Sequence, residues 1–351
     1  MAVYDSFLIS NYRWIEDYCK EKNNTENGTK LDNFRQVLDD FPCAFSIDVA
    51  GLQHTILKDL GNKAWQATAK GVATRKSVSI MDREEYPLFL DDPARFIEKT
   101  AVPRLYETPL NDALVREKAK VYYQSILEEN RSFVELGKMG YDVRNLVLIG
   151  APLDMLADFL RGTKGLLTDL HSDPHWVMEA CQVMVELTFR QVEVYKRYFG
   201  MKDVLLPLHL PTLLGRKDYL NYYHPTYQLL LEGLLEGGYR VLVMVEGNVD
   251  RFIDLMTETD HPDLLLHFES TDLKQCVEKL KGEKTRFSGF YPTHLLRYAG
   301  MEECLDAARL MKETLGETDN FVFATNKVLL SGDDTKVENV KSVYDFFCKK
   351  Q

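Results

Sequence analysis

The chain has 351 residues, of which 45% are hydrophobic and 28% are charged, and it carries a formal net charge of -11. This composition is typical of a globular protein with enough apolar residues for a large core. A nucleic-acid-binding protein normally presents a basic face, and no cluster of lysine and arginine indicates one, so we expect no nucleic-acid partner. No stretch approaches about 18 consecutive apolar residues, so we predict no membrane span.

The cellular location is indicated by the N-terminus and by the cysteines. Residues 1–6 show no basic stretch followed by a long apolar run, so we expect no signal peptide. The six cysteines are dispersed along the chain and form no Cys-x-x-Cys pair. Dispersed cysteines without a secretion signal are typical of reduced thiols, and we therefore predict a cytoplasmic protein.

The first 105 residues are predicted to form an N-terminal extension of helices and a β-ribbon. Residues 1–40 are predicted to be helical around one polar loop, and residues 41–51 suit either a strand or the start of a helix. Residues 65–80 are rich in Thr, Val and Ala and partly alternate, which predicts the β-ribbon. A charged segment marked by prolines follows at 81–103.

Beyond the extension, short apolar runs alternate with helical patterns. Strands are predicted at 145–149, 203–209, 240–245, 264–268, 285–290 and 320–324. Helices are predicted at 109–138, 153–161, 173–199, 225–236, 249–257, 272–281 and 301–315, and from Val337 onwards. This alternation indicates parallel βαβ units, and a (β/α)8 TIM barrel covering residues 1–351 as a single domain fits best. A doubly wound open sheet is the competing fold, but no Gly-x-Gly-x-x-Gly motif follows any strand.

Two neighbouring strands lead into ionisable residues, which are the first candidates for an active site. The run 240–245 leads directly into Glu246, while the run 264–268 contains His267 and is followed by Glu269. Catalytic groups of α/β barrels lie at the carboxyl ends of the strands. Because side chains alternate along a strand, His267 and Glu269 are expected to face the same side. We therefore predict that Glu246, His267 and Glu269 form a catalytic group at one rim.

Two kinds of chemistry suit this group. Zinc accepts carboxylate oxygens and imidazole nitrogens as ligands, and three protein ligands leave a position open for a substrate atom. The same side chains could run acid–base chemistry without a metal. Structural interpretations also stay open, with Glu246 as a solvated loop acid or a helix cap and His267 as a buried histidine with satisfied nitrogens.

A second set of residues is predicted to bind the substrate. His209 ends a strand and an aromatic-rich segment follows it, and such a segment above a barrel can line a pocket for a flat apolar ligand. We predict substrate contacts from His209, Tyr223 and His224, and from Tyr291 beyond the strand at 285–290. The alternative is that His209 is a buried histidine and that the aromatic residues pack on their own neighbours.

Several segments resemble, in the same order, those of one protein superfamily. They are Asp82–Pro87, Asp92–Pro93, Val102–Arg104, Pro152–Gly162, Leu208–His209, Tyr222–Thr226, Val245–Gly247, His267–Asp272, Gly289–Pro292, Leu295–Leu296, Gly300–Glu303 and Glu338–Asn339. In this pattern the chain resembles the uroporphyrinogen decarboxylase superfamily. Within it, the chain is most similar to the corrinoid-dependent methyltransferases of bacterial O-demethylase systems.

The resemblance implies a (β/α)8 barrel that transfers a methyl group from a small methylated donor, such as a phenyl methyl ether, to the cobalt of a corrinoid on a partner protein. It also implies a zinc ion (Zn2+) that activates the donor, held here by Glu246 and His267. Glu246 stands where related methyltransferases carry a metal-binding cysteine. A homodimer, a decarboxylase-type lyase of the same superfamily and a non-catalytic barrel that binds a corrinoid or a partner protein are left open.

The chain also departs from the patterns of that superfamily. The Arg-Gln-Ala-Gly-Arg segment with which the decarboxylases bind substrate carboxylates is absent, which disfavours porphyrinogen decarboxylation. Residues 244–246 replace the His-x-Cys strand end of the coenzyme M methyltransferases. Residues 210–215 replace a Lys-Gly loop, and Phe290 replaces the asparagine that usually follows the glycine. These last two changes predict a more apolar pocket.

Overall fold

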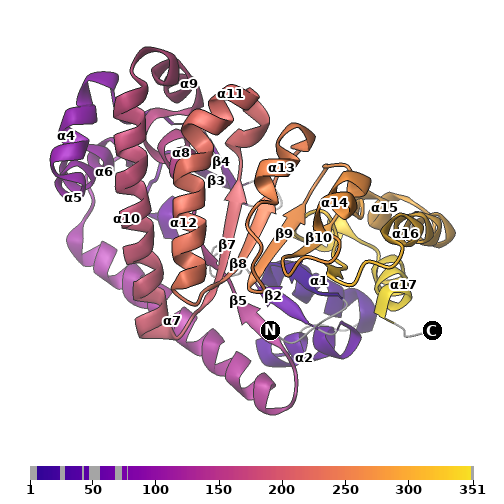
Figure 1. The fold of residues 1–351 in the computed structure, drawn as a ribbon. Helices are drawn as coiled ribbons and strands as arrows, with labels where there is room; N and C mark the ends of the chain where they lie inside the picture. Colours follow the sequence, from indigo (N-terminus) through magenta and orange to yellow (C-terminus); the bar gives the residue numbers. More distant parts are fainter. Residues whose placement is uncertain are drawn as a thin grey trace.

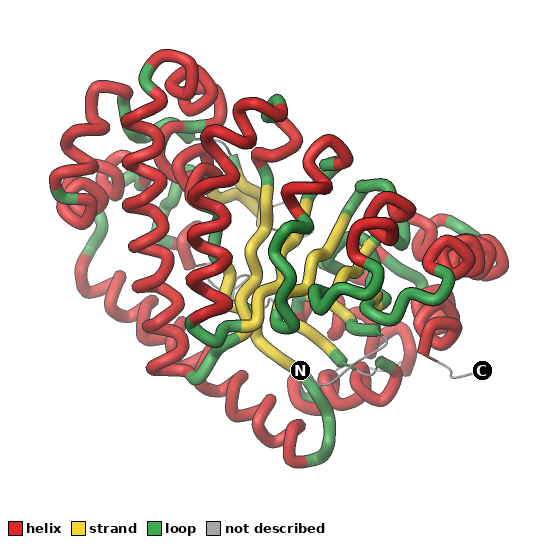
Figure 2. Tube along the Cα trace, viewed as in Figure 1, coloured by secondary structure: helices red, strands yellow, loops and turns green. Residues whose placement is uncertain are grey.

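The computed structural model describes residues 6–23, 28–41, 43–46, 56–67, 73–76 and 78–348. It is a mixed α/β protein in which parallel strands run through the centre and helices lie around them (Figure 2). The end of the apolar stretch at 47–51, and residues 68–72 and 77 of the β-ribbon, lie outside the described residues.

The strands form two parallel sheets and one antiparallel hairpin. The first sheet has the order β1 (Leu8–Ser10), β2 (Ala44–Ser46) and β5 (Val143–Asn145). The second sheet has the order β11 (Phe321–Val322), β10 (Arg286–Gly289), β9 (Leu264–Phe268), β8 (Arg240–Val245), β7 (Asp203–Leu208) and β6 (Val147–Leu148). The hairpin pairs β3 (Trp65–Ala67) with β4 (Ala73–Arg75), which confirms the predicted β-ribbon. The six strands predicted beyond residue 140 are confirmed, with shifts at their ends.

The two sheets adjoin one another on both sides. Leu146 alone separates β5 from β6 along the chain. On the other side, Ser6 forms a parallel bridge with Phe323, and the N–H of Phe7 donates to the carbonyl of Phe323 at 3.0 Å. One small core cluster draws on both sheets, and its members are Phe7, Ile9, Cys43, Phe45, Leu146, Leu205, Leu242, Met244, Leu265, Val322 and Ala324.

The helices lie outside the strands, with α10 and α12 beside β7 and with α14 to α16 beside β9 and β10 (Figure 1). The longer ones are α1 (Tyr12–Asn23), α2 (Lys30–Asp40), α7 (Asp112–Lys138), α9 (Thr163–Ser172), α10 (Pro174–Phe199), α12 (His224–Glu236), α14 (Leu273–Leu280), α16 (Met301–Leu315) and α17 (Val337–Cys348). The shorter ones are α4 (Tyr86–Asp91), α5 (Pro93–Phe96), α6 (Val102–Leu105), α8 (Pro152–Leu156), α11 (Arg216–Asp218), α13 (Ile253–Met256) and α15 (Thr293–Tyr298). Turns of π-helix, labelled η2, η3 and η5, cover Ile97–Ala101, Ala157–Arg161 and Tyr219–Tyr223.

Local sequence explains where several of these elements begin. Asn111 accepts the N–H groups of Ala113 and Leu114 at the start of α7, and Asp272 accepts the N–H of Gln275 at the start of α14. Such caps satisfy N–H groups that have no partner inside the helix. Strand β9 is buried along its whole length, which explains why its sequence is an apolar run and does not alternate.

Three local predictions were wrong or incomplete. Residues 8–10 form β1 and not a helix, because pairing with β2 buries them completely and outweighs local preference. The charged segment 81–103 is mostly helical, since its prolines stand in the first turns of helices, where proline is tolerated. Helix α15 was not predicted, because six residues are too few to show a helical period.

Two findings bear on the predicted cellular setting. Within the residues that the structure describes, no helix is both long and apolar enough to cross a membrane. All six cysteines are free thiols, and five of them are buried.

Candidate active site

Polar side chains gather at the carboxyl ends of the strands in the larger sheet. His209 follows β7, Glu246 follows β8, Glu269 follows β9, and helix α8 begins shortly after β6. The arrowheads of these parallel strands point to one side of the molecule, toward α8, α11 and α13 (Figure 1). In α/β sheets this edge is where ligands bind, so the side chains there are the candidates for an active site.

His209 lies between two carboxylates. Its Nδ1 is 2.9 Å from Oδ2 of Asp158, and its Nε2 is 3.4 Å from Oε1 of Glu246. These two contacts, with Asp158 the stronger, raise the pKa of His209 to about 10 despite partial desolvation. The imidazole therefore keeps its second proton at pH 7. Its side chain is 41% exposed, so a small molecule can reach the ring.

Two aspartates from one short helical segment face this strand end. Asp158 lies in the π-turn η3 that continues α8, four residues after Asp154. Asp154 is buried, and its carboxylate accepts the N–H of Leu210 at 2.7 Å, the N–H of His209 at 3.3 Å and the hydroxyl of Tyr223 at 2.6 Å. Burial raises the pKa of Asp154 to about 6.

Neither Asp154 nor Asp158 was predicted as a site residue. The sequence holds a usable signal, which is a pair of aspartates at i and i+4 just after the glycine that ends a strand. That spacing places both side chains on one face of a helix. The segment was noted only for its resemblance to a superfamily pattern, because nothing in the sequence pairs it with His209.

Glu246 and Glu269 lie on neighbouring strand ends but make different contacts. Glu246 is partly exposed and faces His209. Glu269 accepts the N–H of Gly247 at 2.9 Å and pairs with Nζ of Lys327 at 2.7 Å. Burial raises the pKa of Glu269, but Lys327 and the Gly247 N–H outweigh that effect and lower it overall, so the carboxylate stays ionised.

His267 is fully buried one step below this edge. Its Nε2 faces the carbonyl of Asn326 at 3.3 Å, and its Nδ1 faces the hydroxyl of Ser288 at 2.9 Å. Burial lowers the pKa of His267 to about 4, so the ring is neutral at pH 7. Because a carbonyl can only accept, Nε2 carries the proton and Nδ1 accepts from Ser288.

The predicted zinc pair of Glu246 and His267 does not fit this arrangement. A ligating histidine needs a free lone pair on one ring nitrogen, and both nitrogens of His267 are engaged. Glu246 faces His209 instead. Among the described residues, no three or more His, Cys, Asp or Glu side chains are grouped so that they could hold a metal. Zinc held by these two residues therefore stays a prediction.

The residues predicted to bind substrate do not all lie together in the structure. His209 lies in the carboxylate group, whereas Tyr223 is buried beneath it, against Asp154. His224 opens α12 with its Nε2 3.2 Å from Oε1 of Glu258, within the helical layer. The structure thus brings His209 and Tyr223 to the same aspartate segment and places His224 apart from it.

Tyr291 follows the end of β10 and lies against α16. It is fully buried, and its hydroxyl donates to the carbonyl of Cys304 at 2.9 Å. The preceding residue, Phe290, has a positive φ of 68°, and its ring packs on Phe268 at 5.5 Å. A cavity of about 600 Å³ lies here, with Phe290, Tyr291 and Met311 among its lining residues.

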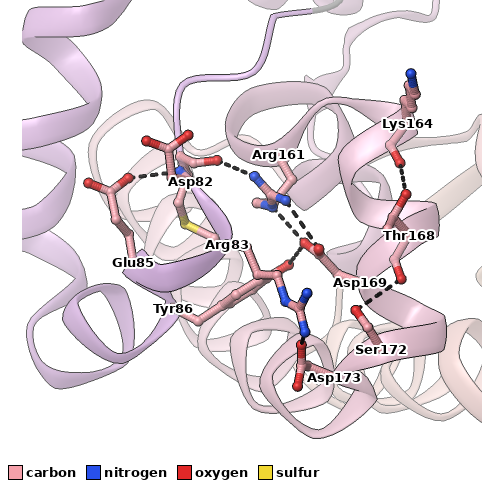
Figure 3. Close-up of polar contacts among 11 residues, drawn as sticks. Asp82, Arg83, Glu85, Tyr86, Arg161, Lys164, Thr168, Asp169, Ser172 and Asp173 are labelled. Carbon is pink, nitrogen blue, oxygen red and sulfur yellow. Dashed lines mark hydrogen bonds and ion pairs between the residues drawn. The ribbon is translucent and has the colours of Figure 1, made fainter.

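A second charged cluster lies away from the strand ends, between the segment that starts at residue 80 and helix α9 (Figure 3). Arg161 donates to both carboxylate oxygens of Asp169, at 2.6 and 3.1 Å, and to the carbonyl of Met81. The hydroxyl of Tyr86 donates to Asp169 at 3.1 Å. Arg161, Asp169 and Tyr86 are all buried. Two segments of the sequence pattern, Asp82–Pro87 and Pro152–Gly162, therefore meet in the interior through Asp169.

Comparisons with known proteins give information on the fold alone. No protein-family model matches the chain, and no curated protein matches it in sequence. A methyltransferase from Methanosarcina mazei matches in structure with a TM-score of 0.63 and 13% sequence identity. The match covers 99% of this chain and 95% of that one. At this identity the likeness shows that the two proteins share a fold over nearly their whole lengths.

Proposed function

We propose that this protein is a methyltransferase that moves a methyl group from a small methylated donor, such as a phenyl methyl ether, to the cobalt of a corrinoid on a partner protein. The fold shared with a methyltransferase and the order of the sequence motifs support the proposal. The observation that carries it is His209, held between Asp158 and Glu246 at the strand ends. A positively charged imidazole in that position can protonate an oxygen leaving group.

We propose further that the two sheets form one closed (β/α)8 barrel of the uroporphyrinogen decarboxylase superfamily. With β5 and β6 taken as one strand interrupted at Leu146, the parallel strands are β1, β2, β5–β6 and β7 to β11. The bridge from Ser6 to Phe323 supports closure between the first and last of them. His209 and Glu246 would then lie at the face of the barrel that carries catalytic residues in this fold.

The proposed reaction exchanges one bond for another. The bond between the donor oxygen and its methyl carbon breaks, and the methyl carbon bonds to Co(I) of the partner's corrinoid, which thereby becomes Co(III). The electron pair of the broken bond stays on the oxygen. His209 donates its Nε2 proton to that oxygen, and solvent returns a proton to the exposed ring. A phenol has a pKa of about 10, close to that of His209, so this proton transfer is nearly balanced.

The carboxylates have separate roles in this scheme. Asp158 binds Nδ1 and so turns Nε2 toward Glu246. Glu246 stabilises the charged ring and lies where the donor oxygen would approach. Glu269 is tied to Lys327 and to the Gly247 N–H, so it shapes the strand-end loop and has no free proton to give.

A direct assay tests the proposed reaction. The purified protein is mixed with a phenyl methyl ether and cob(I)alamin, or with a cognate corrinoid protein. We expect the absorbance of methyl-Co(III) to appear together with an equal amount of the phenol. No methyl transfer from any ether, amine or thioether would overturn the proposal. Release of CO2 from a carboxylated substrate instead would identify the lyase alternative.

Metal analysis tests the zinc prediction separately. If Glu246 and His267 hold zinc, the purified protein contains one zinc per chain, and the Glu246→Ala and His267→Ala variants both lose it. That result would require His267 to release Ser288 and Asn326, and it would replace proton donation by His209 with metal activation of the donor. Zinc content that does not respond to His267→Ala would exclude this pair of ligands.

A further inference from the structure

The proposed reaction makes no use of Asp154, although Asp154 is the most deeply buried acid near His209. Its side chain is 2% exposed. It therefore contacts neither solvent nor a substrate at the strand ends. A buried carboxylate is costly unless hydrogen bonds satisfy it, and here three donors do so. This arrangement calls for a role other than proton transfer.

The donors to Asp154 are two consecutive backbone N–H groups and one phenol. The N–H groups belong to His209 and Leu210, where the chain leaves β7 and turns into the next helical segment. Hydrogen bonds to a charged carboxylate are stronger than neutral ones, so they fix this turn firmly. Asp154 thus binds the backbone N–H of His209, and Asp158, four residues later, binds Nδ1 of the same residue's ring.

Tyr223 completes the arrangement from a different part of the chain. Its hydroxyl lies 2.6 Å from Oδ2 of Asp154, the oxygen that also accepts the His209 N–H. Tyr223 is 1% exposed, so its ring seals this oxygen from water. The Tyr223 hydroxyl fixes the orientation of the Asp154 carboxylate, because Oδ2 accepts from this hydroxyl while Oδ1 accepts from the N–H of Leu210.

We propose that Asp154 and Tyr223 are positioning residues, which aim the imidazole of His209 by fixing the backbone from which it projects. The expected effect of these two residues on the reaction rests on the proposed function. Their expected effect on the backbone at His209 does not. Neither residue touches the donor or the corrinoid in this scheme.

Tyr219 offers a matched control for Tyr223. It stacks on Tyr223 with ring centroids 5.3 Å apart and is equally buried. Among the described residues, the hydrogen-bond partner of its hydroxyl is the sulfur of Met256, at 3.5 Å, and not Asp154. The Tyr219→Phe and Tyr223→Phe variants therefore remove the same atom from the same aromatic stack, but only the second removes a donor to Asp154.

The first readout is structural and independent of activity. Backbone amide exchange at His209 and Leu210 is measured by NMR in the wild type, Asp154→Asn, Tyr223→Phe and Tyr219→Phe. Asparagine presents an amide NH2 at either the Oδ2 or the Oδ1 position, so one backbone N–H loses its acceptor. We therefore expect the amide of His209 or of Leu210 to exchange at least about tenfold faster in Asp154→Asn. We expect a smaller increase in Tyr223→Phe and none in Tyr219→Phe.

The second readout is the methyl transfer assay. We expect kcat to fall about a hundredfold in Asp154→Asn and about tenfold in Tyr223→Phe, with KM within about twofold of the wild type, because donor contacts are unchanged. Tyr219→Phe should keep the wild-type kcat. A purely structural role would lower the melting temperature in both tyrosine variants without separating their kcat values.

The outcomes are distinct. Unchanged amide exchange at both His209 and Leu210 in Asp154→Asn, or equal kcat losses in the two tyrosine variants, would overturn the inference. If Asp154→Asn does not fold, the comparison of Tyr223→Phe with Tyr219→Phe decides it. If the wild type transfers no methyl group, the proposed function fails, and the exchange measurements alone then support or overturn the positioning role.

Discussion

Two clusters in this molecule each hold a cation among oxygens from distant segments, and they differ in access. Arg161 donates to Asp169 and to the carbonyl of Met81, and helices seal all of these groups from solvent (Figure 3). His209 lies between Asp158 and Glu246 at the strand ends, with 41% of its side chain exposed. Arginine stays charged at every relevant pH, whereas histidine can lose its proton. A buried Arg cluster can therefore hold segments together, while an exposed His cluster can exchange a proton with a ligand.

The largest expected effect comes from removing the imidazole of the exposed cluster. We expect His209→Gln to lower the rate of methyl transfer about 10²- to 10⁴-fold, which is the usual contribution of a general acid. The measurement is kcat for methyl-Co(III) formation. His175→Gln is the control, because its ring packs on Trp176 at the start of α10. A rate within about threefold of the wild type would mean that His209 is not the proton donor.

The next largest effect comes from breaking the sealed cluster. Asp169→Asn leaves the buried guanidinium of Arg161 without its countercharge, so we expect a loss of about 3–5 kcal/mol in the free energy of unfolding. Urea titration measures it. Asp173→Asn is the control, since its pair with Arg83 is partly exposed and should contribute less than about 1 kcal/mol. Folded Asp169→Asn should retain its kcat. A loss of kcat without a loss of stability would contradict a purely structural role for the Arg161 cluster.

A smaller effect is expected from removing one carboxylate of the exposed cluster. Glu246→Gln removes one of the three carboxylates, Asp158, Glu246 and Asp154, that raise the pKa of His209, so that pKa should fall toward its ordinary value. The alkaline limit of the methyl transfer rate should therefore move to lower pH, with a loss of about tenfold or less at pH 7. A pH–rate profile measures both quantities. An unchanged alkaline limit would show that His209 does not set it.

The smallest effect is on stability as a function of pH. The pKa of His209 is higher in the folded protein than its ordinary value of 6.5, so the folded state binds the proton more tightly. The resulting stabilisation is complete below about pH 6.5 and is lost as the pH rises toward 10. We expect the melting temperature of the wild type to fall more steeply over this range than that of His209→Gln. Parallel curves would contradict the assignment of a charged ring.

Part of the site could be predicted because strand ends can be recognised in a sequence. Buried parallel strands appear as apolar runs, so the polar residues that end them stand out, and His209, Glu246 and Glu269 were all found in this way. The prediction that Glu246 and His267 act together rested on their adjacency in the strand order. The structure places His267 lower, bonded to Ser288 and Asn326, because its position on β9 lies one step before the strand end.

Local patterns in the sequence are enough to predict the alternation of strands and helices beyond residue 140 and the polar residues at the strand ends. These properties follow from burial and local periodicity, and both can be read from residues that are close together in the sequence. Only the tertiary structure decided that β1 pairs with β2, that Asp154 and Asp158 approach His209, and that Tyr223 lies beneath them. Those contacts join residues about 35 to 70 positions apart, and a single sequence carries no record of which distant polar groups satisfy one another.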